Sequence, residues 1–192
     1  DDTQFVVDYK KGYASFCGNP FNLSVVNYDT YIGKYTGTKI ADGKRRCDFI
    51  LTDTGTDNVI ILCEVTSSIG GIENLSRPIE KTKKDGTRTV VFPRGKYQKV
   101  ELQLYQSLET LTEVPSIASY INSKKRKVCL MSYLIKRTEN NAINAFNRNR
   151  LMEAEEAGEN GAQISCSQIE QFGFDYYRIS HDYSFKIDNN RK

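Results

Sequence analysis

The chain has a single histidine, His181, and no Cys-x-x-Cys pair. A lone histidine excludes metal sites built from several histidines, and it makes Ser–His or Cys–His catalysis unattractive. Structural zinc sites usually contain paired cysteines, so the lack of such a pair argues against one. We therefore expect His181 to be a surface or hydrogen-bonded histidine without a catalytic role.

The chain also lacks a hydrophobic run long enough to span a membrane, and no signal-peptide pattern follows Asp1. Its five cysteines are odd in number and scattered, and three lie in apolar runs typical of strands. These features predict reduced, buried thiols in a cytoplasmic protein that does not bind membranes. With 192 residues, 39% hydrophobic and 27% charged, the sequence predicts a single domain, 1–192, with a substantial core.

Positive charge is clustered, although the net charge is only +3. One cluster lies within residues 81–99 and another within 124–127. Clustered positive charge is expected where a protein contacts a phosphate backbone, but a solvated loop explains it equally well. The residues that we predict to contact nucleic acid are Lys81, Lys83, Lys84, Arg88, Arg94 and Lys96.

Turn formers and hydrophobic periodicity divide the chain into expected elements. Residues Phe21–Tyr31 suit either a strand or a short helix, and the basic stretch at about 67–95 predicts an arm with a hairpin tip at Lys84–Thr87. The other expected elements are strands at Tyr35–Ile40, Arg45–Leu51, Asn58–Thr66, Val128–Ile135 and Asp175–Ile187, and helices at Lys96–Glu113 and Glu139–Gly158. This order predicts an α/β domain with a mixed central sheet flanked by helices.

Two acidic residues occupy mirrored positions in the hairpin formed by the second and third strands. If the turn is centred on Thr56, opposed residues have numbers that sum to 112, so Asp48 faces Glu64. Opposed side chains lie roughly 5 Å apart at Cβ, and like charges at that distance repel. Both acids lie in otherwise apolar strands. A divalent cation between them would remove the repulsion, which predicts a metal site with these two ligands.

The arrangement resembles the PD-(D/E)xK nuclease superfamily, whose restriction-endonuclease-like core has Asp on one hairpin strand, Glu-x-Lys on the next, then a helix and a further strand. Cys47-Asp48 stands at the first motif and Glu64-Val65-Thr66 at the second. The resemblance covers about residues 35–135. It implies Mg²⁺, with Mn²⁺ substituting, held by Asp48, Glu64 and the carbonyl of Val65.

Thr66 replaces the lysine of the family, and a threonine cannot supply its positive charge. Arg46 faces Thr66 in the same register, and Lys99 begins a polar stripe on the following helix; either cation would compensate. Gln103 lies in that stripe, although an ordinary solvated helix face explains both stripe residues slightly better. A further acid from the amino-terminal part, Asp8 or Asp29, would complete the site.

These features predict a metal-dependent nuclease that hydrolyses phosphodiester bonds, with catalytic candidates Asp48, Glu64, Lys99, Arg46 and Gln103. The expected partner is nucleic acid, DNA before RNA, and a homodimer is compatible with the resemblance. A degenerate nuclease-fold protein that only binds nucleic acid or a protein is the alternative, because Thr66 lacks the charge. A third interpretation is an unrelated α/β interaction or immunity protein, in which the two acids would be splayed apart.

Overall fold

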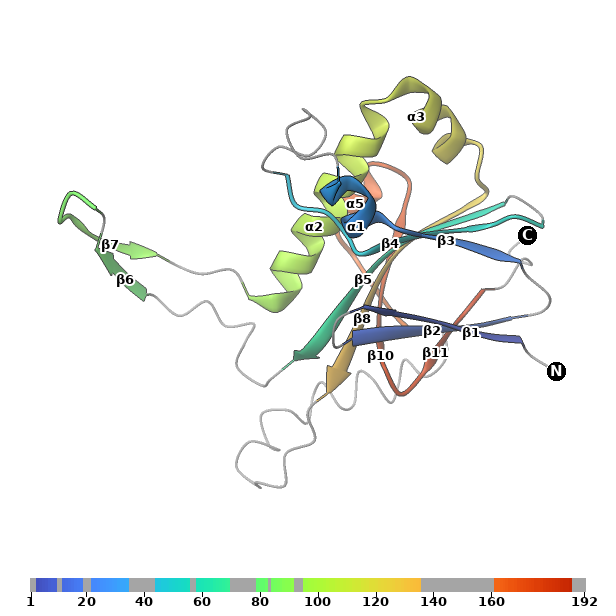
Figure 1. Cartoon of the computed structure of the whole chain (residues 1–192), viewed down its shortest axis with the longest axis horizontal. Helices are drawn as coiled ribbons and strands as arrows, with labels where there is room; N and C mark the ends of the chain where they lie inside the picture. The colour runs from blue at the N-terminus through green and yellow to red at the C-terminus, as the bar shows by residue number, and fades with distance from the viewer. Residues whose placement is uncertain are drawn as a thin grey trace.

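The computed structural model describes residues 3–9, 12–18, 22–34, 44–55, 58–69, 79–82, 84–91, 95–135 and 161–187. Its strands form a six-stranded, a three-stranded and a two-stranded sheet (Figure 1). The six-stranded sheet has the order β3 (Leu23–Asn27), β4 (Phe49–Asp53), β5 (Val59–Ile69), β8 (Arg126–Ile135), β10 (Asp175–Ser180) and β9 (Ala162–Ile164). The three-stranded sheet has the order β1 (Thr3–Tyr9), β2 (Gly12–Gly18) and β11 (Ser184–Lys186).

The six-stranded sheet is mixed, which confirms the predicted α/β class. Strands β3, β4 and β5 pair antiparallel, whereas β8 runs parallel to β5 and β10 parallel to β8. The parallel step from β5 to β8 requires a crossover, which contains α2 (Lys96–Thr112) and α3 (Pro115–Asn122). Two short helices, α1 (Tyr28–Gly33) and α5 (Ser167–Glu170), complete the described helices.

The two faces of this sheet are covered differently (Figure 1). The helices pack on one face over Ile60 and Leu62 of β5, and the three-stranded sheet packs on the other face over Ile61 and Cys63. Side chains of a strand alternate between faces, so even-numbered β5 residues point toward α2. Among the described elements the helices therefore flank one face only, and a second sheet replaces the helices expected on the other.

Several sequence-based boundaries are confirmed and others are wrong. Helix α2 and strand β8 lie where predicted, and Phe21–Tyr31 contains both a strand and a helix. The predicted strand Asp175–Ile187 is wrong as a single element, because the chain turns at residues 181–183 and continues as β11 in the other sheet. Pro115 begins α3 as its first residue. Tyr35–Ile40 and Glu139–Gly158 lie outside the described residues.

The basic arm contains a hairpin of β6 (Ile79–Thr82) and β7 (Arg88–Val91), which stands apart from the larger sheets in Figure 1. Its tip is at the predicted position, where Asp85 Oδ1 accepts a hydrogen bond from the Thr87 amide and Gly86 adopts a positive φ of 83°. Across the described residues, no helix is long and apolar enough to cross a membrane. All five cysteines are thiols, and four of them are buried.

Candidate functional site

The hairpin register predicted from the turn is confirmed. Phe49 pairs with Cys63 and Leu51 with Ile61, so paired residues have numbers that sum to 112. Asp48 and Glu64 are the next residues beyond the Phe49–Cys63 pair. Both are buried, with exposed fractions of 6% and 7%. The two carboxylates therefore lie side by side between the sheet and the helices, on the face that carries Leu62 and Ile60.

Each carboxylate is held in place by the protein. Asp48 Oδ2 accepts a hydrogen bond of 2.9 Å from the backbone amide of Val65 on the neighbouring strand. Glu64 Oε1 accepts one of 2.7 Å from Gln103 Nε2 of α2, but Glu64 Oε2 is buried without a hydrogen-bond partner among the described residues. Burial and the negative charge of Asp48 raise the pKa of Glu64 well above its usual range, although the Gln103 hydrogen bond acts in the opposite direction.

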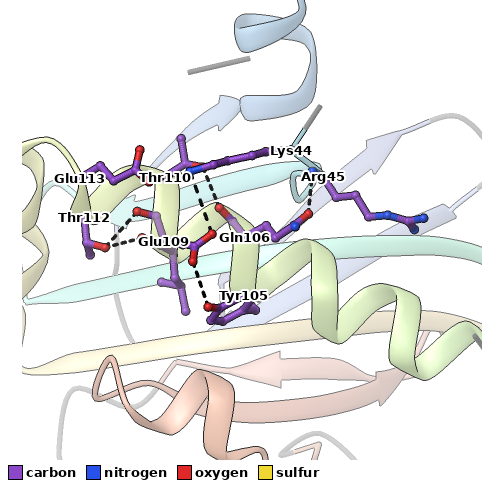
Figure 2. Close-up of polar contacts among 9 residues, drawn as sticks. Lys44, Arg45, Tyr105, Gln106, Glu109, Thr110, Thr112 and Glu113 are labelled. Atoms are coloured by element: carbon purple, nitrogen blue, oxygen red, sulfur yellow. Dashed lines mark hydrogen bonds and ion pairs between the residues drawn. The ribbon is translucent and has the colours of Figure 1, made fainter. Parts of the chain in front are cut away.

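A row of polar contacts joins the segment before β4 to α2, and we call this row the α2 clamp. In it Lys44 Nζ contacts Glu113, and the Arg45 amide donates to Gln106 Oε1 (Figure 2). The Cys47 amide donates to Ser107 Oγ. Gln103 Nε2 extends the clamp by donating to the Arg46 carbonyl as well as to Glu64. Gln106 and Ser107 lie three and four residues after Gln103, and Glu113 lies two turns beyond Gln106, so one face of α2 aligns the residues that lead into Asp48.

Helix α1 brings a third acid toward the pair. The Asp48 carbonyl accepts hydrogen bonds from the amides of Tyr28 and Asp29, at 2.8 and 3.3 Å. Asp29 is close enough for its charge to raise the pKa of Glu64 further, and its Oδ1 accepts a bond of 2.7 Å from Arg46 Nε. Of the two upstream acids considered from sequence, Asp29 lies near the pair, whereas the side chain of Asp8 lies outside the described residues.

An open, polar depression lies beside Glu64. Its volume is 330 Å³, and its lining residues are Asp29, Lys44, Arg45, Arg46 and Gln103. Gln103 joins this depression to the acid pair, because the same amide contacts Glu64. The arrangement therefore places two buried carboxylates next to a solvent-accessible surface rich in cations.

Of the two cations predicted to replace the lysine, Arg46 lines the depression and Lys99 does not. Arg46 lines the depression, but its guanidinium pairs with Asp29 instead of lying opposite Thr66, whose buried Oγ1 has no hydrogen-bond partner among the described residues. Lys99 is exposed one turn before Gln103, and its side chain forms no hydrogen bond or ion pair within the described segments. The helix pattern favoured a solvated face for Gln103. The structure differs, because the Gln103 side chain donates hydrogen bonds to Glu64 and to the Arg46 carbonyl.

The predicted nucleic-acid residues are spread along the arm. Lys84 and Arg88 are exposed at the hairpin, and Lys96 is half-buried at the start of α2. Lys81 lies in β6 opposite Thr89, whereas Lys83 and Arg94 lie outside the described residues. The surface at the acid pair is instead supplied by residues 44–46, which the sequence presents only as a short charged run before Asp48.

His181 differs from the expectation. Its side chain is 3% exposed and stacks on Tyr13 with ring centroids 4.4 Å apart. Neither ring nitrogen has a hydrogen-bond partner among the described residues. Burial lowers its pKa to about 4, although the Ser132 backbone and Asp182 act in the opposite direction. His181 is therefore neither on the surface nor satisfied by hydrogen bonds, and it is neutral at physiological pH.

Comparisons with known proteins do not assign the chain to a family. No family model, no curated protein and no solved structure matches the chain.

Proposed function

We propose that this chain is a metal-dependent nuclease that hydrolyses phosphodiester bonds, with DNA favoured over RNA. The observation that carries the proposal is the Glu64 carboxylate, which is buried beside Asp48 with one oxygen unsatisfied. Burying an unpaired carboxylate beside another costs free energy, and folding alone gives no reason to do so. A divalent cation bound by both acids would remove the repulsion and use the unsatisfied oxygen.

The donor set fits a hard cation such as Mg²⁺, with Mn²⁺ as a substitute. Mg²⁺ prefers oxygen ligands, keeps several waters and is often held by one or two carboxylates together with substrate phosphate. In the described part of the chain, no group of three or more His, Cys, Asp or Glu side chains could hold a metal ion. Two carboxylates that leave room for water and phosphate suit Mg²⁺ better than a closed zinc site.

The order of elements supports the same proposal. The antiparallel β4–β5 hairpin carries the two acids on its helix-facing side, α2 follows, and β8 then pairs parallel to β5. This is the order implied by the resemblance to PD-(D/E)xK nucleases. The carbonyl of Val65 remains a proposed third ligand, consistent with its amide contact to Asp48.

The protein's own residues divide the work at such a site. When bound, the metal ion would lower the pKa of a water molecule and neutralise charge on the phosphate. Asp48 and Glu64 hold the ion, and Gln103 fixes the orientation of Glu64 through its 2.7 Å hydrogen bond. Arg46 offers a fixed positive charge at the adjoining depression, so it is a stronger candidate than Lys99 for the function of the missing lysine.

Cleavage assays test the proposal directly. We expect the protein to cut plasmid, single-stranded DNA or RNA with Mn²⁺ and to be inactive with EDTA. Asp48→Asn and Glu64→Gln should each lower the rate by at least about 100-fold while the fold is kept. Asp175→Asn is the matched control, because Asp175 is an exposed acid outside the site. Cleavage by either site variant at the rate of the control would refute the proposal.

A degenerate nuclease-fold protein that binds without cleaving is the second candidate. It is favoured by Thr66, which brings no charge, and by the exposed Lys99, which does not reach the acid pair within the described structure. In that case a proton on Glu64 would relieve the repulsion instead of a cation. Mn²⁺ titration separates the two, because a ligand that binds only the folded state stabilises it. A rise in melting temperature that Glu64→Gln abolishes supports the enzyme, and no rise supports the binder.

A further inference from the structure

We infer that Arg45 and Arg46 form a phosphate-binding subsite for the nucleic-acid strand, adjacent to the acid pair. The inference rests on the proposed function, because it places the substrate strand at the same site. It places the main contact with the nucleic-acid backbone at the segment that leads into β4. The sequence predicted this contact at the β6–β7 hairpin instead. This segment is positively charged, its backbone is fixed, and it lies next to the acid pair.

The lining of the depression carries an excess of positive charge. Its five residues include three cations, Lys44, Arg45 and Arg46, and one carboxylate, Asp29. Pockets for small organic ligands are mainly apolar, whereas every residue that lines this one is charged or carries a polar amide. An open, polar and positively charged surface suits a phosphodiester backbone, which is recognised by charge and hydrogen bonds.

The three cations are engaged to different degrees. Lys44 Nζ contacts Glu113 at 2.6 Å and Glu109 at 4.0 Å, so its charge is largely compensated. Arg46 uses Nε for Asp29, and a guanidinium carries further N–H donors that a phosphate can share. The side chain of Arg45 is exposed and forms no hydrogen bond or ion pair within the described segments. Figure 2 shows its guanidinium directed away from the helix contacts.

The backbone of this segment is fixed although the Arg45 side chain is not engaged. The Arg45 amide donates to Gln106, the Arg46 carbonyl accepts from Gln103, and the Cys47 amide donates to Ser107. A fixed backbone lowers the entropic cost of ordering the side chain on a ligand. Because Gln103 also contacts Glu64, a phosphate held by Arg45 and Arg46 would lie next to the proposed cation.

Oligonucleotide binding tests this subsite independently of cleavage. Fluorescence anisotropy with labelled 12-nucleotide DNA and RNA strands in EDTA measures affinity without hydrolysis. We expect Arg45→Ala to weaken binding about fivefold and to reduce the slope of log K against log salt by about 0.7, which is the loss of one phosphate contact on a single strand. Arg45→Lys should retain most of the affinity, because the charge is kept.

Two single-charge variants serve as matched controls. Lys125→Ala removes an exposed charge just before β8. Lys125 lies at the end of the sheet where β5 begins, away from Glu64. Arg88→Ala removes one on the hairpin. Equal losses in Arg45→Ala and Lys125→Ala, a loss only in Arg88→Ala, or no binding by the unmodified protein would each overturn the inference. Strand binding that depends on Arg45 without any Mn²⁺-dependent cleavage would support the subsite and refute the nuclease.

Discussion

Glu64 is the residue at which stability and proposed function conflict most clearly. It lies in a strand whose neighbours are apolar and fully covered, yet it is a carboxylate beside another carboxylate. Its Oε1 accepts a hydrogen bond from Gln103, and its Oε2 is unsatisfied among the described residues. Buried polar groups without partners cluster at functional sites, because a fold selected only for stability would replace them.

The first prediction concerns Glu64→Gln in the absence of metal. The amide keeps the shape and the contact with Gln103 but removes the charge beside Asp48. We therefore expect this variant to be more stable in EDTA by about 1–2 kcal/mol, measured by chemical denaturation. Glu101→Gln is the control with the opposite sign, because Glu101 Oε1 pairs with Arg178 at 2.7 Å and its loss should destabilise. A destabilised Glu64→Gln protein would mean that the folded protein stabilises the Glu64 charge.

The second prediction concerns His181 and pH. Its pKa is about 4 in the folded protein and near 6.5 in the unfolded chain, so the unfolded state takes up the proton first as pH falls. The stability associated with neutral His181 is complete above pH 6.5 and is lost as pH falls from about 6.5 to 4. Between pH 7 and 5 the loss should be about 2 kcal/mol.

His181→Phe isolates this contribution, because phenylalanine keeps the ring that stacks on Tyr13 but cannot be protonated. Free energies of unfolding at pH 7 and pH 5 should differ less in the variant than in the unmodified protein. The carboxylates titrate in both proteins, so their contribution cancels in the comparison. The same pH dependence in both would show that His181 gains its proton without cost.

At the scale of elements, hydrophobic pattern and turn chemistry predicted the centre of the fold. The turn after Asp53 set the β4–β5 register, which the Phe49–Cys63 pair confirms. Hydrophobic periodicity predicted α2, on which Val100, Leu104 and Leu108 are buried. Such local signals are strong because a shift of one residue in register would move every side chain of β5 to the opposite face of the sheet.

Other features could not be predicted because they depend on contacts distant in sequence. Gln103 has the same local pattern as a solvated helix residue, and both of its partners, Glu64 of β5 and the Arg46 carbonyl, are distant in sequence. Strand β3 pairs antiparallel with β4, but no hydrophobic periodicity in the sequence separated β3 from the helix α1 that follows it. The β10–β11 break at residues 181–183 contains neither glycine nor proline, so the alternation continues through a change of sheet.

The third prediction tests whether α2 positions the acid pair. Gln103→Leu removes the hydrogen bonds to Glu64 and to the Arg46 carbonyl while it retains a good helix former. We expect Mn²⁺-dependent activity or metal affinity to fall about 10–100-fold, as is typical when the partner of a metal ligand is lost. Gln106→Leu is the matched control, because the Gln106 side chain accepts a hydrogen bond from the Arg45 amide and, among the described residues, contacts no acid. Its loss should lower stability by about 1 kcal/mol without a comparable change in metal affinity. Equal effects of the two variants on metal affinity would assign Gln103 a purely structural role.

At the scale of the whole molecule, the three-stranded sheet supports the strand that carries Glu64 from behind. Phe16 and Phe185 of that sheet share a core with Cys63 and Val65 of β5. Ser132 Oγ, on the strand next to Val65, donates a hydrogen bond of 2.7 Å to the Tyr13 carbonyl. The end of β5 is therefore held between α2 on one face and the start of β2 on the other.

The fourth prediction follows from a close backbone approach between the three-stranded sheet and β5. A Cβ at Gly12 would lie 3.1 Å from the backbone carbon and oxygen of Thr66, two residues beyond Glu64, so Gly12→Ala requires β2 and β5 to move apart slightly. We expect a stability loss of about 1–3 kcal/mol and, in addition, a smaller stabilisation by saturating Mn²⁺ than the unmodified protein shows. Gly55→Ala is the control, because its added Cβ meets only side-chain atoms, Asp53 Oδ1 at 3.3 Å and Asn22 Nδ2 at 3.8 Å. If Gly12→Ala lost stability but kept the full response to Mn²⁺, the second sheet would stabilise the fold without positioning the acid pair. A reduced response in Gly12→Ala alone would show that the metal site depends on both layers packed against β5.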